Sequence, residues 1–314
     1  MAAVSTQAVI ETLKQQAMVS LSANGKTFYW ASFFLGRQKA SSAALLYSGC
    51  RQLDDIADTN SGDKDAIRLT LTTIQREILQ AGATGIHSAS ALFRYLIDAH
   101  GLDAGAVNSL LDGMIQDTRP VRFTDQQALD SYCYRVAGTV GIMMCAVLGV
   151  RDTKALPFAI DLGIAMQLTN VSRDVLEDAG GGRRYLPVEI AVDSLVCSSD
   201  DTRNQVARMM DLQLQRAELF YESGIAGLAY LPRGSRIAIY LAAILYRAIG
   251  RQLRKNTCNW WQGRTVISKQ QKLLMTLLAL PVLCWLPIKA RPAASCKHNH
   301  LLHIHLAGLP HADT

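Results

Sequence analysis

Apolar residues recur at intervals of three and four along almost the whole chain, the spacing that gathers them on one face of an α-helix. Clusters of Gly, Pro, Asn and Ser interrupt this pattern, for example at residues 22–26, 59–63 and 231–234, and favour turns. No segment shows the strict alternation that is typical of strands. The pattern therefore predicts an all-α fold, with helices near residues 4–20, 37–58, 65–80, 87–100, 103–115, 125–149, 153–178, 202–229, 235–256 and 268–286.

The predicted helices follow one another through short connections, without a long linker or an internal repeat, so we expect a single domain. We divide the chain into a lead helix at residues 1–23, a helical domain at 24–289 and a tail at 290–314. The tail carries Pro, Ser and five of the seven histidines, and we expect it to be poorly ordered, although its histidine content is also typical of metal-binding tracts. Its histidines are His298, His300, His303, His305 and His311.

The overall composition limits the class of protein. With 314 residues, of which 49% are hydrophobic and 18% charged, the chain is neither disordered nor of low complexity. Its apolar runs stop short of the roughly 18–20 residues that a membrane-spanning helix needs, and its N-terminus lacks the pattern of a secretory signal. The seven cysteines form no CxxC motif and indicate reduced thiols. We therefore expect a cytoplasmic protein.

Charge is distributed unevenly along the chain. Residues 1–222 contain 20 basic and 25 acidic residues, whereas residues 223–314 contain 12 basic residues and a single acidic one. Such a basic segment favours an anionic partner, either a phosphorylated ligand or lipid headgroups. Nucleic acid is the least favoured partner, because the basic residues are interleaved with apolar helical stretches and no nucleic-acid-binding motif is present.

The apolar stretch at residues 273–285 has basic residues on both sides. It is compatible with a last core helix that has basic ends, which we favour slightly. It is also compatible with a helix that lies in the interface of an anionic membrane, which would make the protein peripheral on the inner face of the membrane. The flanking residues are Lys269, Lys272, Lys289 and Arg291.

Two clusters of acidic residues carry the strongest chemical signal. In the first, Asp54 and Asp58 are four residues apart and share one helical face with Ala43 and Tyr47, a face that is otherwise suited to burial. In the second, polar residues form a stripe along one face of an apolar helix. The residues of this stripe are Gln167, Asn170, Asp174 and Asp178.

Like charges four residues apart weaken a helix, and their cost grows when they are buried without a compensating cation or proton. A single acidic cluster is most often an exposed turn, but two clusters on inward faces make that interpretation much weaker. Carboxylate and amide oxygens suit Mg²⁺, which commonly binds through carboxylates and substrate phosphates. Arg51 and Arg173 adjoin the two clusters and add guanidinium groups suited to phosphate. The sequence therefore predicts a magnesium–diphosphate site.

Several motifs together resemble those of the squalene/phytoene synthase family, over roughly residues 24–288. Within this family the chain looks most like the bacterial phytoene synthases. The motifs are Arg51-xx-Asp54-Asp55-xx-Asp58, Gln167-xx-Asn170-xx-Arg173-Asp174-xx-Glu177-Asp178, Arg184-Tyr185-Leu186-Pro187, the segment from Tyr132 to Gly141, and Phe28-Tyr29-Trp30-Ala31.

This resemblance implies an isoprenoid-synthase helical bundle with a central cavity. It also implies an enzyme of carotenoid biosynthesis that joins two molecules of geranylgeranyl diphosphate head to head. The product of that reaction is phytoene, formed through the cyclopropyl intermediate prephytoene diphosphate. The implied cofactor is Mg²⁺, with Mn²⁺ as an alternative, and no NADPH is expected.

The resemblance also assigns roles to individual residues. Metal binding falls to Asp54, Asp58, Asn170, Asp174 and Asp178. Diphosphate binding falls to Arg51, Arg173, Arg184, Gln167, Tyr246 and Arg264. Tyr132 would lie near the reacting carbons, where it could stabilise a cation or assist removal of a proton. The catalytic set is then Asp54, Asp58, Tyr132, Asp174 and Asp178.

Three alternatives remain at this point. One is a synthase that joins two farnesyl diphosphates into dehydrosqualene, and a second is a squalene-type synthase. The third is a membrane-associated assembly factor that has lost catalysis, which the presence of all four predicted aspartates disfavours. The expected partners are prenyl diphosphates, the surface of an anionic membrane and downstream carotenoid enzymes.

Overall fold

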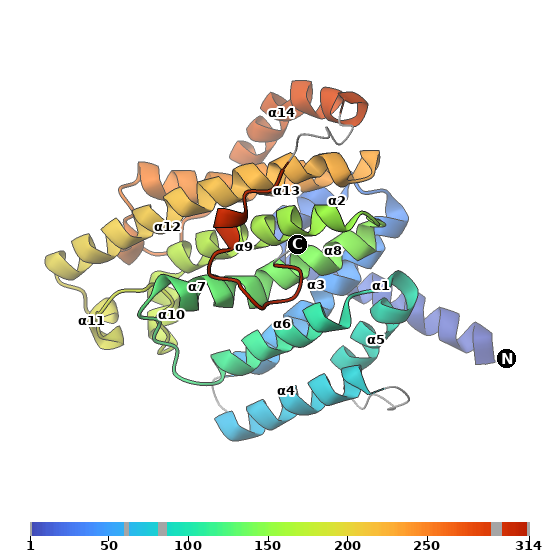
Figure 1. Ribbon diagram of the computed structural model, residues 1–314, viewed down its shortest axis with the longest axis horizontal. Helices are drawn as coiled ribbons and strands as arrows, with labels where there is room; N and C mark the ends of the chain where they lie inside the picture. The colour runs from blue at the N-terminus through green and yellow to red at the C-terminus, as the bar shows by residue number, and fades with distance from the viewer. Residues whose placement is uncertain (1, 60–62, 81–86, 290–296, 313–314) are drawn as a thin grey trace.

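The computed structural model describes residues 2–59, 63–80, 87–289 and 297–312, and in these ranges the chain is almost entirely helical (Figure 1). The only strand-like contact in the described ranges is an isolated bridge between Arg122 and Arg184, so the all-α prediction is confirmed. The helices are α1 (Ala2–Asn24), α2 (Lys26–Ser32), α3 (Arg37–Ala57), α4 (Lys64–Leu79), α5 (Ser88–His100), α6 (Ala104–Asp117), α7 (Gln126–Cys133), α8 (Thr139–Leu148), α9 (Leu156–Arg173), α10 (Val175–Gly180), α11 (Val192–Val196), α12 (Asp200–Ala226), α13 (Arg233–Lys255) and α14 (Lys269–Lys289). Single turns of other helix types are η1 (Tyr134–Gly138), η2 (Thr153–Ala155), η3 (Gly227–Tyr230), η4 (Trp260–Gln262) and η5 (His300–His303).

Local capping explains why many predicted boundaries lie close to the observed ones. Side-chain oxygens of Asp63, Asp103 and Asp125 accept backbone N–H groups in the first turns of α4, α6 and α7. Gly149 follows α8 in the left-handed conformation, with φ 77°, which ends that helix. The short helices α2 and α11 were not predicted, because they are too brief to show a helical period.

Two of the long predicted helices are interrupted in the structure. The helix predicted at 125–149 contains a π-helical turn, η1, between α7 and α8. The helix predicted at 153–178 begins with η2 and is broken at Asp174, which separates α9 from α10. Both interruptions occur beside residues that line the cavity described below, where irregular helical turns are often found.

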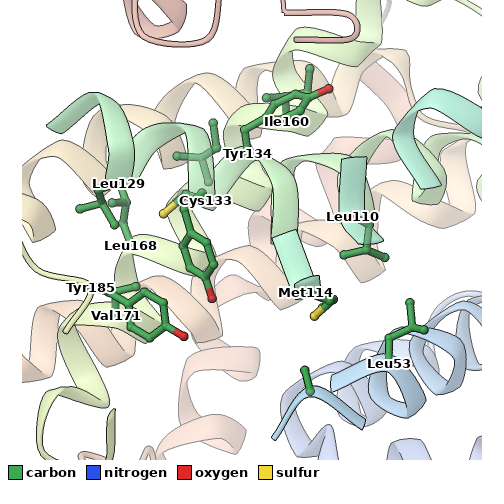
Figure 2. Packing of buried hydrophobic residues seen from close by; sticks show 14 of the residues in the cluster. Leu53, Leu110, Met114, Leu129, Cys133, Tyr134, Ile160, Leu168, Val171 and Tyr185 are labelled. Atoms are coloured by element: carbon green, nitrogen blue, oxygen red, sulfur yellow. The ribbon is translucent and has the colours of Figure 1, made fainter. Parts of the chain in front are cut away.

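Helix α9 lies at the centre of the core. Figure 2 shows Leu168 and Val171 of α9 among the buried side chains that also include Leu129 and Cys133 of α7. A Cβ atom built on Gly163 would lie 2.2 Å from the carbonyl oxygen of Ala137, so α9 and η1 approach each other backbone to backbone. This close packing fixes α9, and with it the polar stripe that α9 carries.

The stretch Gln126–Leu148 is the one helical segment of the described chain that is long and apolar enough to cross a membrane by length and composition. In the structure, 56% of its apolar window is buried against other parts of the protein. Its position between α6 and α9 explains its composition without a membrane.

The described part of the C-terminal tail, residues 297–312, is folded, which differs from the expectation of disorder. It crosses the face formed by α7, α8 and α9, where it is drawn in dark red in Figure 1. The Ser131 hydroxyl donates to the carbonyl of His305 at 3.3 Å, and His303 is buried. Composition did not reveal these contacts, because the residues that the tail contacts lie on helices far away in the sequence. Residues 290–296 of the predicted tail lie outside the described residues.

Candidate active site

A cavity of about 780 Å³ opens between α3, the α9–α10 segment, α13 and the chain that follows η4. Both predicted pairs of carboxylates line this one cavity, so the structure brings the two acidic clusters together as expected. The predicted site residues on its wall are Arg51, Asp54, Asp58, Tyr132, Gln167, Asn170, Arg173, Asp174, Asp178, Tyr246 and Arg264.

The first carboxylate pair lies at the C-terminal end of α3. Buried Leu53 holds this end of the helix against the core, which leaves the next residue, Asp54, on the cavity wall. Asp58 follows α3 directly and donates its backbone N–H to the carbonyl of Asp54 at 2.8 Å. Arg51 reaches Asp54 at 3.4 Å and Asp55 at 2.5 Å, and Asp55 does not line the cavity.

The second carboxylate pair lies at the junction of α9 and α10. Asp174 accepts two hydrogen bonds from the guanidinium of Arg173, at 2.7 and 2.5 Å, and lies 3.1 Å from the guanidinium of Arg264. Although the helix is interrupted at Asp174, the backbone N–H of Asp178 still donates to the carbonyl of Asp174 at 2.8 Å. The two carboxylates therefore remain one turn apart, on the side that faces the cavity.

Uncharged polar groups continue the stripe along α9. The hydroxyl of Tyr246, on α13, donates to the side-chain oxygen of Asn170 at 2.9 Å. The amide nitrogen of Asn170 donates in turn to the side-chain oxygen of Gln167 at 3.1 Å. This chain fixes the orientation of the Asn170 amide, whose oxygen is a suitable ligand for a hard cation.

Negative charge is concentrated in the cavity. Desolvation, followed by repulsion from Asp174, raises the pKa of Asp178 to about 8. Desolvation, followed by repulsion from Asp58, raises the pKa of Asp54 to about 6. Repulsion from Asp58 also contributes to the raised pKa of Asp178, so the two pairs interact across the cavity. A divalent cation would relieve this repulsion, and the oxygen donors present fit Mg²⁺.

One predicted diphosphate ligand, Arg184, is placed elsewhere. Its guanidinium donates to the backbone carbonyls of Ile190 and Phe123, and its side chain is buried outside the cavity. The neighbouring Arg183 lines the cavity instead and forms an ion pair with Asp58 at 2.6 Å. Arg184 therefore holds the loop that follows α10, whereas Arg183 faces the site.

Asp117, at the end of α6, also lines the cavity, although no sequence motif pointed to it. Its carboxylate accepts hydrogen bonds from Tyr132 at 2.8 Å and from Tyr185 at 2.9 Å. Burial raises the pKa of Asp117 to about 6 and holds the pKa of Tyr132 well above its usual value, so the tyrosine stays protonated. In the sequence, Asp117 lies just beyond the helix predicted at 103–115, and no spacing links it to the other acidic residues.

A second, apolar cavity of about 250 Å³ adjoins the polar one. The two cavities share Phe28, Val136, Gln167, Asn170 and Tyr246. Beyond these residues the second cavity is walled mainly by apolar side chains, including Met144, Leu148, Phe158, Met166 and Leu228. A polar chamber that continues into an apolar one suits a ligand with an anionic head and a hydrocarbon chain.

A family model described as squalene/phytoene synthase matches residues 21–271, which are most of the chain. The chain belongs to this family. As a member of the squalene/phytoene synthase family it is an enzyme that transfers prenyl groups, in agreement with a site that joins carboxylates and arginines to an apolar cavity.

Individual relatives support the family assignment. The chain is 32% identical to the 15-cis-phytoene synthase of Pantoea ananas over 281 residues, and this alignment covers 85% of this chain and 91% of the relative. It is 35% identical to the 15-cis-phytoene synthase of a Paracoccus strain over 245 residues, and this alignment covers 73% of this chain and 78% of the relative. A crystal structure of a dehydrosqualene synthase with a ligand superposes with a TM-score of 0.75 at 25% identity, covering 88% of this chain and 98% of that one.

The adjacent arginines provide a test of the site. We expect Arg183→Gln to lower turnover of a prenyl diphosphate about 10–100-fold, because a charge-assisted hydrogen bond to an anion contributes about 1.5–3 kcal/mol. We expect Arg184→Gln to lower the free energy of unfolding by about 1–3 kcal/mol, because it leaves buried carbonyls without a donor. Steady-state kinetics and denaturant unfolding of both variants measure these effects. The assignment is wrong if Arg183→Gln keeps full activity while Arg184→Gln loses activity at unchanged stability.

Proposed function

We propose that this protein is a phytoene synthase, which condenses two molecules of geranylgeranyl diphosphate into prephytoene diphosphate and converts that intermediate to phytoene. The observation that carries the proposal is the pair of opposed carboxylate clusters in a cavity that continues into an apolar chamber. The similarity to bacterial proteins named 15-cis-phytoene synthase, at 32–35% identity, supports this choice of activity.

The polar end of the cavity would bind the diphosphates. We propose that Asp54, Asp58, Asn170, Asp174 and Asp178 hold Mg²⁺, or Mn²⁺ in its place. When bound, the ion would act as a Lewis acid that stabilises the departing diphosphate. Arginine side chains on the same wall would bind the remaining phosphate oxygens and neutralise the charge that develops on them. These are Arg51, Arg173, Arg183 and Arg264.

The apolar end would protect the reactive carbocation. Loss of diphosphate from an allylic substrate leaves a cation that water would capture, so the hydrocarbon chain must react where water is excluded. Tyr132 lies where the polar wall approaches Val136, a residue shared by both cavities. Its hydroxyl donates to Asp117 at 2.8 Å, and both residues line the polar cavity. We propose that Tyr132 stabilises the cation and that the Asp117–Tyr132 pair assists removal of the proton.

The identity of the product tests the proposal. We expect purified protein with Mg²⁺ and geranylgeranyl diphosphate to form phytoene, identified by its mass and ultraviolet spectrum, without added NADPH. The same assay with farnesyl diphosphate would reveal dehydrosqualene formation, the second candidate, which the similarity to a dehydrosqualene synthase structure favours. Exclusive formation of the shorter hydrocarbon would replace the proposed activity with the second one.

A matched pair of aspartates tests the metal site. Asp54 lines the cavity, whereas the adjacent Asp55 does not and pairs with Arg51. We expect Asp54→Asn to lower turnover about 10²–10³-fold or more, because it removes a ligand for the ion that stabilises the leaving group. Asp55→Asn should retain activity within about tenfold of the parent.

Removal of the metal is a second test of the same site. We expect excess EDTA to abolish turnover and added Mg²⁺ to restore it. Equal activity of the Asp54→Asn and Asp55→Asn variants, or turnover that resists EDTA, would contradict the metal assignment.

We also propose that the enzyme is cytoplasmic and binds peripherally to the inner face of an anionic membrane, where downstream carotenoid enzymes would receive its apolar product. Helix α14 supports this proposal, because four leucines at helical spacing are at least half exposed and lie beside Lys269 and Lys272. The leucines are Leu273 at 50%, Leu274 at 56%, Leu277 at 51% and Leu278 at 71% exposure.

Flotation with liposomes tests this surface. We expect the protein to float with vesicles that contain anionic lipid and to float less with zwitterionic ones. The double variant Leu274→Ser/Leu278→Ser should lose most of the binding, whereas Leu69→Ser, which changes a leucine of similar exposure on α4, should not. Absence of flotation with either vesicle, or equal loss in all variants, would rule out α14 as the binding surface.

A further inference from the structure

The folded C-terminal segment places two imidazoles on one buried carboxylate, away from the active-site cavity. Asp161, on α9, has no exposed surface. Its two oxygens lie 2.7 Å from Nε2 of His303 and 2.8 Å from Nε2 of His298, and the hydroxyl of Ser223 also donates to it. The side chains of both histidines are at least nine-tenths buried, and the potential ligand atoms of the three residues lie within 4.8 Å of one another.

The hydrogen bonds of His303 leave this cluster in need of a cation. Its Nδ1 lies 2.9 Å from the carbonyl oxygen of Ala312, which can only accept, so Nδ1 carries a hydrogen. A neutral His303 therefore presents the lone pair of Nε2 to the carboxylate of Asp161. Two acceptors do not lie 2.7 Å apart unless a positive ion, either a proton or a metal, is placed between them.

His298 presents its Nε2 to the second oxygen of the same carboxylate, at 2.8 Å, and its side chain is only 5% exposed. Its Nδ1 is buried and has no hydrogen-bond partner among the described residues. Ligation of an ion through Nε2 places the hydrogen on Nδ1, so the bond to the ion must offset the cost of that unsatisfied donor. The case for a metal therefore rests on the convergence of the two Nε2 atoms on one buried carboxylate.

We propose that Asp161, His298 and His303 bind a divalent transition-metal ion of the Zn²⁺ type, which fastens the C-terminal segment to α9. Two imidazoles and one carboxylate are a common set of protein ligands for zinc, with solvent in the fourth position. The bond from His303 Nδ1 to a backbone carbonyl is the outer contact that orients metal-binding histidines. The Mg²⁺ proposed for the active site prefers an all-oxygen set, so the two sites select different ions.

Binding of the ion requires only a small local movement. Two bonds of about 2.0 Å at the tetrahedral angle separate a nitrogen and an oxygen by roughly 3.3 Å, compared with 2.7 and 2.8 Å in the structure. Because α9 is fixed by its backbone contact at Gly163, this shift would have to come from the tail segment that carries the two histidines. Asp161 precedes Asn170 by nine residues, about 13 Å along a helix, so the site is separate from the active-site residues.

The test uses Zn²⁺ itself with the full chain. The protein is stripped with a chelator, dialysed into saturating Mg²⁺ and titrated with Zn²⁺ against a coloured competing chelator, with thermal unfolding followed in parallel. We expect one Zn²⁺ per chain, a raised Tm, and a visible spectrum typical of tetrahedral coordination when Co²⁺ replaces Zn²⁺. Loss of outer contacts alone weakens metal binding about 10–100-fold, so we expect loss of a ligand in His303→Ala to weaken it at least about 100-fold.

A second tail histidine provides the matched control. Nδ1 of His305 lies 2.7 Å from the carboxylate of Asp130, outside the cluster, so His305→Ala disturbs tail docking without removing a ligand. We expect His305→Ala to bind Zn²⁺ as the parent does. The proposal is overturned if the parent binds no more Zn²⁺ than His303→Ala, since the cluster then holds a proton only, or if His305→Ala loses binding equally. The Zn²⁺ titration and Co²⁺ spectrum of the parent decide the matter even if a variant fails to fold.

Discussion

The mutual repulsion of two carboxylate pairs is the constraint on which the rest of the site depends. Packing of α3 and α9 in one core places Asp54 and Asp58 in the same cavity as Asp174 and Asp178. The protein offsets this repulsion only in part, through ion pairs such as that of Arg183 with Asp58. Desolvation, followed by repulsion from Asp174, raises the pKa of Asp178 to about 8, so the cavity remains unfavourable to a further negative charge. A site of this kind is completed by cations and by the anionic group that they bridge.

Helix α9 connects the parts of the molecule. Its polar stripe ends at the carboxylates, and Gln167 and Asn170 lie where the polar cavity meets the apolar one. Farther toward its N-terminus, Asp161 receives the C-terminal segment. Because Gly163 lets the backbone of η1 approach directly, α9 is held rigidly enough to position all three features. The division between a charged chamber and an apolar chamber matches the two-part character of the proposed prenyl diphosphate substrates.

The sequence predicted the features that depend on local spacing and missed those that depend on turns and long-range contacts. The helices and the stripe from Gln167 to Asp178 followed from a repeat of three to four residues. Spacing could not show that Arg183, and not Arg184, lines the cavity, because Gly182 adopts a left-handed backbone conformation that sets the direction of the chain after α10. Asp117 and the folded tail were missed for a similar reason. The residues that they contact lie on other helices, and the spacing of residues within one segment does not predict such long-range contacts.

The most direct test of the central claim is a crystal structure of the protein with Mn²⁺ and a non-reactive analogue of a prenyl diphosphate, in which anomalous scattering locates the metal. We expect Mn²⁺ between Asp54 and Asp58 on one side and Asp174 and Asp178 on the other, bound to the diphosphate, with the hydrocarbon chain in the apolar cavity. Metal and diphosphate bound outside this cavity, or a diphosphate held there without any metal, would contradict it.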